Sequence, residues 1–303
     1  MVASYLVHLF HRGLKPATIK VHRAAVQSVL KHIAPQLASS ALLHDLCKRF
    51  EIERPRTVRV LPKFDLNLVL WQMLKPPFVD KAGGTDYRIP LSTMVAKVTF
   101  LLALATGSRT SELHALSRAR GALTWERFPE GKRVVSMKPF PRFLAKNDRP
   151  DRVPSPIVIP SMDHIVGREP ERLWCPVRAV EIYLARTPDG PYAADDFHLL
   201  RHPKSTVRTT KGHIALWIRR AVTLAYEAAG EGTESVHCNP HEVRAIAHSL
   251  AAYNGASLRE VIQGGRWSSS EPFFRHYLRD MSETLSGSIG RRPLIVAGNL
   301  LNA

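Results

Sequence analysis

The spacing of apolar residues predicts helices along most of this chain. Residues 1–50 repeat apolar positions at helical intervals, with Pro16 suited to a first turn and Pro35 closing the stretch. The apolar face expected there consists of Ile19, Val26, Val29, Leu30 and Ile33. Residues 91–107 show the same spacing and indicate a buried helix. Further helices are predicted at 66–75, 175–186, 211–230 and 239–255.

Two interruptions divide this helical pattern. Residues 51–65 are rich in charge, contain two prolines and lack a regular period, which indicates a linker, and Asp65 can cap the helix that follows. Three short segments separated by turn residues are typical of strands, at 122–128, 133–139 and 156–160. The predicted fold class is therefore mainly α with a small antiparallel β-sheet.

The composition of the chain indicates that it binds a polyanion. The 303 residues are 45% apolar, enough for a sizeable core, yet 43 Lys and Arg face 26 Asp and Glu, for a net charge of +17. So basic a protein usually binds a polyanion, most commonly nucleic acid, whereas acids would serve solubility better. Residues 1–63 hold 11 basic and 3 acidic side chains, so this end is expected to be a contact module.

Four cations of this end lie off the predicted apolar face: Lys15, Lys20, Arg23 and Lys31. They form either an ordinary solvated surface or a surface that follows a phosphate backbone. We interpret them as contacts to the phosphate backbone of a nucleic acid.

The remaining composition indicates an intracellular protein. Cys47, Cys175 and Cys238 are few, odd in number and without CxxC spacing, which favours a reducing compartment over a disulfide framework. The first residues lack the cleavage site of a signal peptide, and the longest apolar run, Val98–Ala105, is too short to cross a bilayer. We expect a nuclear or cytoplasmic protein without a membrane partner.

The first stretch that carries chemistry is ATGSRTSELHAL, residues 105–116. A Gly-Ser break ends one helix, Ser108 can cap the next, and Arg109 and Glu112 then share one face. A surface ion pair would explain this pattern, but the strongly apolar neighbours favour a buried turn. A buried guanidinium needs a carboxylate or a phosphate.

The second stretch is NPHEVRAIAHSL, which begins at Asn239. Asn239 and Pro240 are typical of a helix start, and Glu242 completes a capping-box pattern. His241 and Arg244 then share a face near the positive end of the helix dipole, which suits an anion.

A metal site is the alternative interpretation of the same region. His237, Cys238 and His241 could all bind a metal, but no second cluster supplies a fourth ligand. We therefore expect no metal ion and no other cofactor.

The third stretch is GGRWSSSEPFFRHYLRD, residues 264–280, in which Tyr277 lies among cations. Taken alone, Tyr277 is an ordinary half-buried aromatic. Taken together, the three stretches resemble the tyrosine recombinases, the phage-integrase family, over roughly residues 65–285 and more weakly in the N-terminal part. The family's T-G-x-R-x-S-E-L motif matches Thr106 to Leu113, its H-x-x-R motif matches His241 to Arg244, its Gly-His or Gly-Trp position falls at Trp267, and its nucleophile falls at Tyr277.

This resemblance implies DNA strand transfer through a 3′-phosphotyrosyl intermediate, without a metal or ATP. The catalytic residues would be Arg109, Lys146, His241, Arg244, Trp267 and Tyr277, with Glu112 in support. Arg109 and Arg244 would hold the phosphate that Tyr277 attacks. His241 would hydrogen-bond the phosphate or assist proton transfer, and Lys146 would give a proton to the departing 5′ oxygen. Trp267 would donate from its indole N–H.

Two positions stay open. The family's lysine lies on a β-hairpin turn, where both Lys138 and Lys146 are available; we favour Lys146 because Lys138 ends a predicted strand. Trp267 precedes Tyr277 by ten positions, one more than the family's usual gap, so Arg266 is a rival phosphate contact.

The resemblance also implies the organisation of the chain. A helical core-binding domain would occupy 1–55, shorter than in the family and so either truncated or a weaker clamp on DNA, followed by a linker at 56–64, the catalytic domain at 65–285 and a tail at 286–303. SELHALS, LWCPVRAVEIYLART and WSSSEPFFRHYLRD are most similar to the DIRS-type and Crypton-type mobile-element recombinases. The resemblance implies double-stranded DNA as the partner, with a dimer or tetramer assembled on it. The alternatives are a non-catalytic DNA-binding protein on the same scaffold and a type IB topoisomerase.

Overall fold

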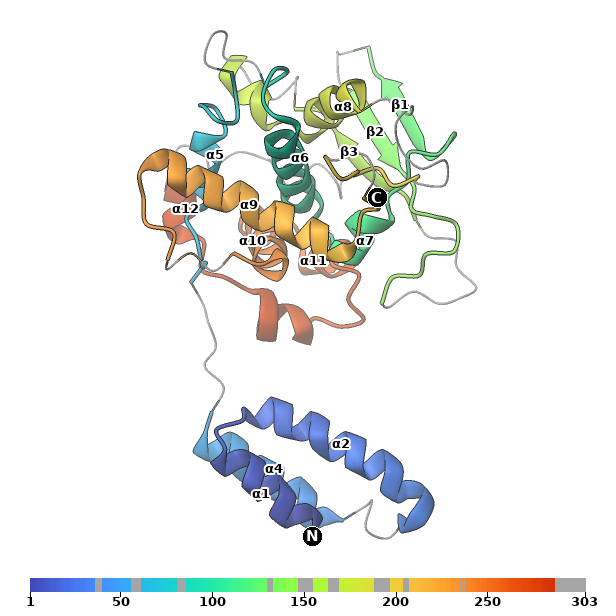
Figure 1. Ribbon diagram of the computed structural model, residues 1–303, viewed down its shortest axis with the longest axis vertical. Coiled ribbons are helices and arrows are strands. Elements are labelled where there is room, and N and C mark those ends of the chain that lie inside the picture. The colour runs from blue at the N-terminus through green and yellow to red at the C-terminus, as the bar shows by residue number, and fades with distance from the viewer. Residues whose placement is uncertain are drawn as a thin grey trace. The chain divides into compact units, whose positions relative to one another are not determined.

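The computed structural model describes residues 1–35, 40–55, 61–80, 86–129, 133–146, 155–162, 169–187, 197–203, 207–234, 236 and 238–286. It confirms a mainly helical chain with a small antiparallel sheet. The chain divides into two compact units, Met1–Val58 and Arg59–Ala303 (Figure 1).

The first unit consists of α1 (Val2–His11), α2 (Pro16–Ile33) and α4 (Ala41–Glu53). Its small core is formed by Leu6, Leu9, Phe10, Ile19, Leu43, Cys47 and Phe50. Pro16 begins α2, as predicted, but the predicted apolar face of this helix is wrong in part. Ile19 is its one buried residue, while Val29 and Ile33 are 59% and 76% exposed, because α1 and α4 cover only one side of α2.

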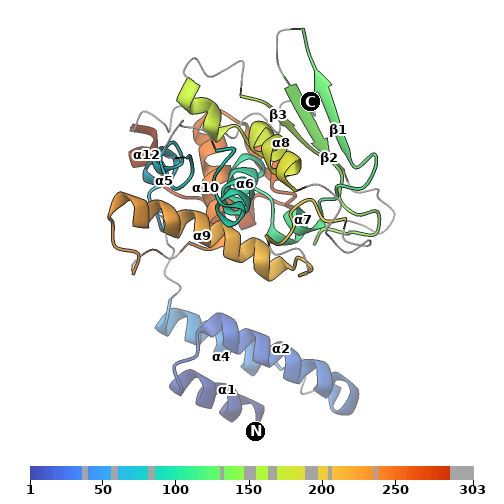
Figure 2. The same cartoon turned by 45° about the horizontal axis from the view of Figure 1, so that its top comes forward.

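The second unit is arranged around α6 (Leu91–Thr106), which Figures 1 and 2 show in its middle, with α8, α9 and α10 around it. Its other helices are α5 (Leu66–Gln72), α7 (Thr110–Ala115), α8 (Pro176–Arg186), α9 (Lys211–Ala229), α10 (Pro240–Tyr253), α11 (Leu258–Gly264) and α12 (Ser282–Ser286). A 3-10 helix, η1, spans Glu169–Trp174, and a π-helical turn, η2, spans Phe273–Tyr277.

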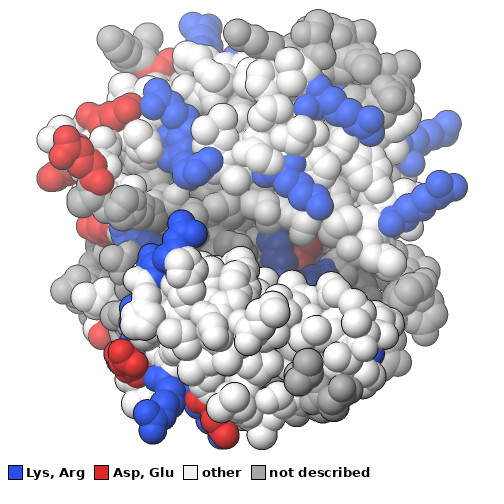
Figure 3. Space-filling model, turned by 60° about the horizontal axis from the view of Figure 1, so that its bottom comes forward, with Lys and Arg blue, Asp and Glu red and all other residues white. Residues whose placement is uncertain are grey.

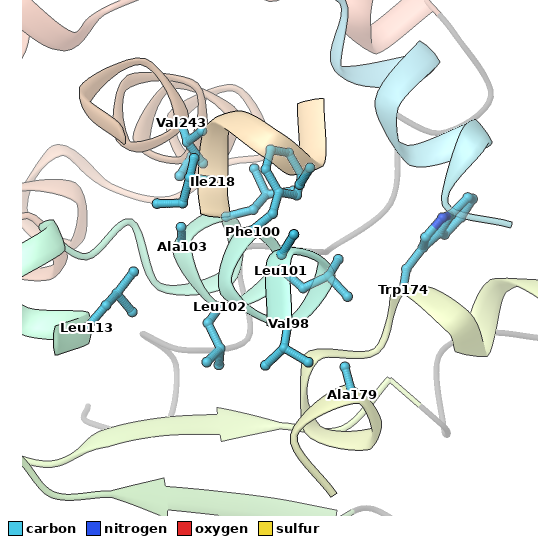
Figure 4. Packing of buried hydrophobic residues seen from close by; sticks show 14 of the residues in the cluster. Val98, Phe100, Leu101, Leu102, Ala103, Leu113, Trp174, Ala179, Ile218 and Val243 are labelled. Carbon is cyan, nitrogen blue, oxygen red and sulfur yellow. The ribbon is translucent and has the colours of Figure 1, made fainter. Parts of the chain in front are cut away.

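α6 is buried continuously from Thr93 to Ala105, as expected of a helix with apolar side chains on every side. Figure 4 shows Ile218 of α9 and Val243 of α10 on one side of it and Ala179 of α8 on another. This packing makes the end of α6 a rigid starting point for the turn that follows.

The sheet is antiparallel in the order β1-β2-β3. Its strands are β1 (Leu123–Arg127), β2 (Arg133–Met137) and β3 (Ile157–Pro160), as predicted. Val135 of the central strand pairs with Trp125 and Ile159 and is fully buried. The connection from β2 to β3 carries Lys146.

The start of the second unit lies within the predicted linker. Residues 56–60 of that linker, and 287–303 of the predicted tail, are outside the described residues. Phe64 is buried against Phe100 of α6, with ring centres 6.3 Å apart, and Asp65 caps α5 by accepting from the Asn67 N–H. In the described part of the chain, each helix is too short or too polar to span a membrane.

Candidate active site

α6 ends at Gly107, whose conformation leads the chain into the site. Gly107 has φ +57°, in the left-handed region that glycine adopts without strain. A Cβ atom there would lie 2.2 Å from Cε1 of His248, a buried residue of α10. Both conditions require glycine, so this turn is fixed by backbone conformation and by close packing against α10.

Arg109 and Glu112 form a closed pair at the start of α7. Glu112 Oε2 accepts from the Arg109 backbone N–H at 2.8 Å, and Oε1 accepts from Nη1 at 2.9 Å. The Glu112 side chain is 4% exposed and that of Arg109 14%. The predicted cap was wrong: Arg109, and not Ser108, is the N-cap of α7, because the Glu112 carboxylate satisfies the first free N–H.

Arg244 reaches from α10 to the same turn. Its side chain is buried and donates from Nη1 to the carbonyl of Gly107 and from Nη2 to the carbonyl of Gly265. Nη1 is also 3.9 Å from Glu112 Oε2. One carboxylate therefore contacts both Arg109 and Arg244.

Two guanidiniums beside one carboxylate leave this cluster positive. Loss of hydration on burial lowers the pKa of Arg244 to about 10; repulsion from Arg109 adds to this, while Glu112 and Tyr277 oppose it. Arg244 therefore remains charged at neutral pH. An anion held by both guanidiniums would relieve their mutual repulsion.

Tyr277 approaches this cluster from a later segment. It ends η2, and its side chain is half-buried. Cζ of Arg244 lies 5.5 Å from the centre of the Tyr277 ring and 5.0 Å from the Trp267 ring, and the two rings are 4.9 Å apart. The structure thus brings Arg109, Arg244, Trp267 and Tyr277 together from distant parts of the sequence.

His241 lies at the first turn of α10, beside both arginines. Partial loss of hydration lowers the pKa of His241, and the charges of Arg244, Arg109 and Lys146 lower it further. The imidazole is therefore mainly neutral at pH 7. Lys146 is one of the cations whose charge acts on His241, which favours it over Lys138, the exposed residue that directly follows β2.

Trp267 and Arg266 differ in what they contact. Trp267 is 9% exposed and packs against His248 and Phe273 as well as Tyr277, with ring centres 4.8 and 5.7 Å away for the first two. Arg266 has the positive φ of 49° and donates from Nη2 to the Ser155 carbonyl at 3.4 Å. The geometry therefore places Trp267 inside the aromatic cluster and directs Arg266 toward the segment that enters β3.

His248 belongs to the site, although the sequence reasoning missed it. Its Nδ1 bonds the Arg244 carbonyl at 2.8 Å, where the imidazole must be the donor. Burial, together with the charge of Arg244, lowers the pKa of His248 to about 3, so it stays neutral. Its position four residues after Arg244 and seven after His241 was the available signal, because these spacings share a helix face.

The role predicted for Glu242 in a capping box is wrong. Asn239 does cap α10, with its side chain accepting from the Glu242 N–H at 2.9 Å, and Pro240 occupies the first turn as predicted. The Glu242 carboxylate, however, does not return to the N-cap. It binds Arg279 through two hydrogen bonds, because a buried guanidinium is the stronger partner.

The alternative metal site gains no support from the described residues, among which no three His, Cys, Asp or Glu side chains are placed to hold a metal ion. His237, one of its three candidate ligands, lies outside them. Burial raises the pKa of the Cys238 thiol to about 12, which disfavours the thiolate that binds metals. The positive charges that lower the pKa of His241 also disfavour a metal cation beside it.

The four cations predicted to contact DNA differ in their surroundings. Lys20 pairs with Glu51 at 2.7 Å, and Arg23 donates to the Leu43 carbonyl of α4 at 3.4 Å, so Arg23 contributes to packing. Lys15 and Lys31 are exposed. Figure 3 shows Lys and Arg side chains dispersed among uncharged ones on the visible surface.

Solved structures share this fold, although no known family profile and no curated protein matches the sequence. A lambda integrase dimer bound to a COC′ core site is similar over 93% of this chain and 79% of that one, with a TM-score of 0.50 and 12% identity. The XerH site-specific recombinase bound to difH substrate, in a pre-cleavage complex, is similar over 95% of this chain and 68% of that one, with a TM-score of 0.52 and 18% identity. The chain therefore has the fold of the tyrosine recombinases.

Proposed function

We propose that this protein is a site-specific DNA recombinase of the tyrosine type, which cuts and rejoins DNA through a covalent protein–DNA intermediate. The observation that carries the proposal is the convergence of Arg109, Arg244 and Tyr277: the two guanidiniums share Glu112, and the phenol ring lies 5.5 Å from one of them. Two cations and a hydroxyl suit a phosphodiester, which offers two anionic oxygens and an electrophilic phosphorus. The shared fold adds support.

The reaction would be a transesterification at phosphorus. The Tyr277 oxygen forms a bond to phosphorus while the bond to the 5′ oxygen breaks, which leaves a 3′-phosphotyrosyl linkage and a 5′ hydroxyl. The phenol loses a proton and the departing oxygen gains one, so atoms and charge balance. Because the new linkage is again a phosphodiester, a 5′ hydroxyl from another strand can reverse the step without ATP.

The arginines would act mainly on the transition state. Negative charge grows on the non-bridging oxygens as phosphorus becomes five-coordinate, and Arg109 and Arg244 are held in place before the reaction begins. Glu112 would position both of them and would not touch DNA. This preorganisation would raise the rate more than the affinity.

Proton transfer would fall to His241 and Lys146. A neutral imidazole can accept the phenolic proton or hydrogen-bond the phosphate, and partial burial, with the neighbouring cations, lowers the pKa of His241 and keeps it neutral. The ammonium of Lys146 would protonate the departing 5′ oxygen. Trp267 would pack the Tyr277 ring and offer its indole N–H to the phosphate.

The first unit would bind the duplex beside the cut, with exposed Lys15 and Lys31 as phosphate contacts. Its affinity should then fall steeply with salt, because each neutralised phosphate releases a counterion. We further propose that the protein acts as a dimer or tetramer in the nucleus and integrates a mobile element. The support for the last point is the likeness of SELHALS and WSSSEPFFRHYLRD to DIRS-type and Crypton-type recombinases.

Covalent capture on nicked duplexes with a randomised central segment tests the proposal. Wild-type protein should yield a Tyr277 peptide bearing a 3′-phosphotyrosyl linkage by mass spectrometry, and Tyr277→Phe should not. Tyr253→Phe, which changes an exposed tyrosine of α10, should react as wild type does. DNA binding without an adduct on any duplex of the randomised pool would identify a non-catalytic DNA-binding protein. Relaxation of a supercoiled plasmid that lacks paired target sites would instead identify a topoisomerase-like activity.

A further inference from the structure

The segment that carries Tyr277 is tied to α10 by a buried ion pair outside the phosphate site. Arg279 Nε donates to Glu242 Oε1 at 2.9 Å, and Nη2 donates to Oε2 at 3.1 Å. Arg279 is 8% exposed and Glu242 2%. This two-point contact fixes both the distance and the orientation of the guanidinium.

Further bonds extend the contact to the backbone around Tyr277. Nη1 of Arg279 donates to the carbonyls of His276 and Leu278 at 3.2 and 3.0 Å. The hydroxyl of Ser249, also on α10, donates to the Tyr277 carbonyl at 3.1 Å and accepts from the Arg279 N–H at 2.9 Å. Every residue from 276 to 279 is therefore bonded to α10 or to the guanidinium that α10 holds.

α10 presents its two sets of side chains on separate faces. Glu242 and Ser249 are seven residues apart, about two helical turns, and so share one face. His241, Arg244 and His248 share a neighbouring face and form the phosphate side of the site. One rigid helix thus sets the position of the cations and also that of the nucleophile.

The local backbone alone would not fix Tyr277 so firmly. η2 has five residues, and the chain is already extended at Leu278, with φ −61° and ψ 129°. A buried ion pair contributes little net stability compared with apolar packing, because desolvation offsets its attraction. What such a pair does supply is a defined geometry.

We propose that Glu242 and Arg279 are positioning residues, which hold the Tyr277 hydroxyl at the distance from Arg244 that attack on phosphorus requires. This inference rests on the proposed recombinase function. It predicts that loss of the pair slows strand cleavage without weakening DNA binding, because both side chains are buried and offer almost no surface to DNA.

The experiment compares single-turnover adduct formation at saturating DNA with the Kd for the same duplex. Glu242→Met/Arg279→Met removes both charges together and leaves no unpaired buried ion. Its cleavage rate should fall about 100-fold, as expected when a reacting group shifts by about 1 Å, while the Kd changes less than about threefold. Arg279→Lys retains the charge without the two-point contact and should recover only part of the rate.

The matched controls come from the same segment. Glu271 and Arg275 form an exposed pair at 3.2 Å, with side chains 73% and 57% exposed, so Glu271→Gln and Arg275→Met should cleave at the wild-type rate. Ser249→Ala offers a second test if the double variant does not fold, and its rate should fall about tenfold. Because Ser249 lies two turns from His241, that loss would not come from the imidazole.

The outcomes separate the two proposals. Absence of an adduct with wild-type protein would contradict the proposed recombinase function itself. An adduct that forms at the wild-type rate in a folded double variant, or in Ser249→Ala, would overturn the positioning role and leave the function intact. Equal losses of rate and affinity would also overturn it, because they would show a general structural defect.

Discussion

The guanidinium carbon of Arg244 lies 5.5 Å from the centre of the Tyr277 ring, although the two residues belong to different elements. Two arms of this guanidinium are held by the carbonyls of Gly107 and Gly265, so two loops define its position. A phosphate that bound here would meet a cation that needs no rearrangement.

Replacement of Arg244 by lysine should therefore lower the rate of strand cleavage, although it conserves the positive charge. A single ammonium cannot bond both carbonyls and also grip a phosphate oxygen as the planar fork can. We expect single-turnover adduct formation to fall about 100- to 1000-fold, measured on a nicked duplex at saturating protein. Arg220→Lys, at an exposed arginine of α9 paired with Glu227, is the control. A fall in rate of less than about threefold would show that Arg244 does not stabilise the transition state.

The elements themselves were predictable because their signals are local. Short segments between turn residues predicted the three strands, and Asn239 with Pro240 predicted the start of α10. The spacing of Arg109 and Glu112 likewise predicted their contact, because residues three apart on a helix are neighbours.

The contacts that the sequence did not predict are those between residues far apart in the chain. Glu242 fits a capping box locally, but the Glu242 carboxylate accepts two charge-assisted hydrogen bonds from Arg279. No local sequence pattern predicts this contact. Val29 and Ile33 follow a helical period, yet burial requires a facing element, and α2 has one only around Ile19. The preference for Lys146 over Lys138 stays a prediction, because the position of a loop lysine relative to His241 is set by tertiary packing.

Gly107→Ala should be strongly destabilising. The new Cβ would meet the His248 ring at 2.2 Å, and alanine at φ +57° is strained as well, so we expect a loss of about 2–5 kcal/mol in the free energy of unfolding. Gly230→Ala is the matched control: it caps α9 at φ +74° with no atom within 4 Å, and should cost about 1–2 kcal/mol.

Urea denaturation of a double-mutant cycle separates the two causes of the Gly107 effect. In a His248→Ala background the clash is gone, so Gly107→Ala should lower the free energy of unfolding only by the cost of backbone strain, about 1–2 kcal/mol. Equal costs in both backgrounds would show that contact with His248 is irrelevant.

His248 should also make stability fall in acid. Burial, and then the charge of Arg244, lowers the pKa of His248 to about 3, whereas the unfolded chain has the ordinary value of 6.5. Between these values the unfolded state binds a proton that the folded state excludes, so the free energy of unfolding decreases as pH falls through this window. From pH 7 to pH 5 this group alone should cost about 2 kcal/mol. The loss over that interval should therefore be about 2 kcal/mol smaller in His248→Gln, and parallel pH profiles for the two proteins would contradict the assignment.

Lys146→Ala should slow cleavage by removing the proton donor for the departing oxygen. An alkoxide is a poor leaving group, and a positioned acid typically contributes at least about 100-fold to the rate. Lys138→Ala removes an exposed lysine from the same connection and should leave the rate unchanged.

A duplex with sulfur in place of the bridging 5′ oxygen makes the test of Lys146 specific. A thiolate leaves without protonation, because thiols are far more acidic than alcohols, with a pKa of about 8.5 for cysteine. On this substrate the Lys146→Ala defect should shrink to within about tenfold of wild type, while an Arg244→Lys defect should persist, since charge on the non-bridging oxygens still grows. A Lys146 defect of the same size on both substrates would show that the ammonium acts on the phosphate charge and does not supply the proton.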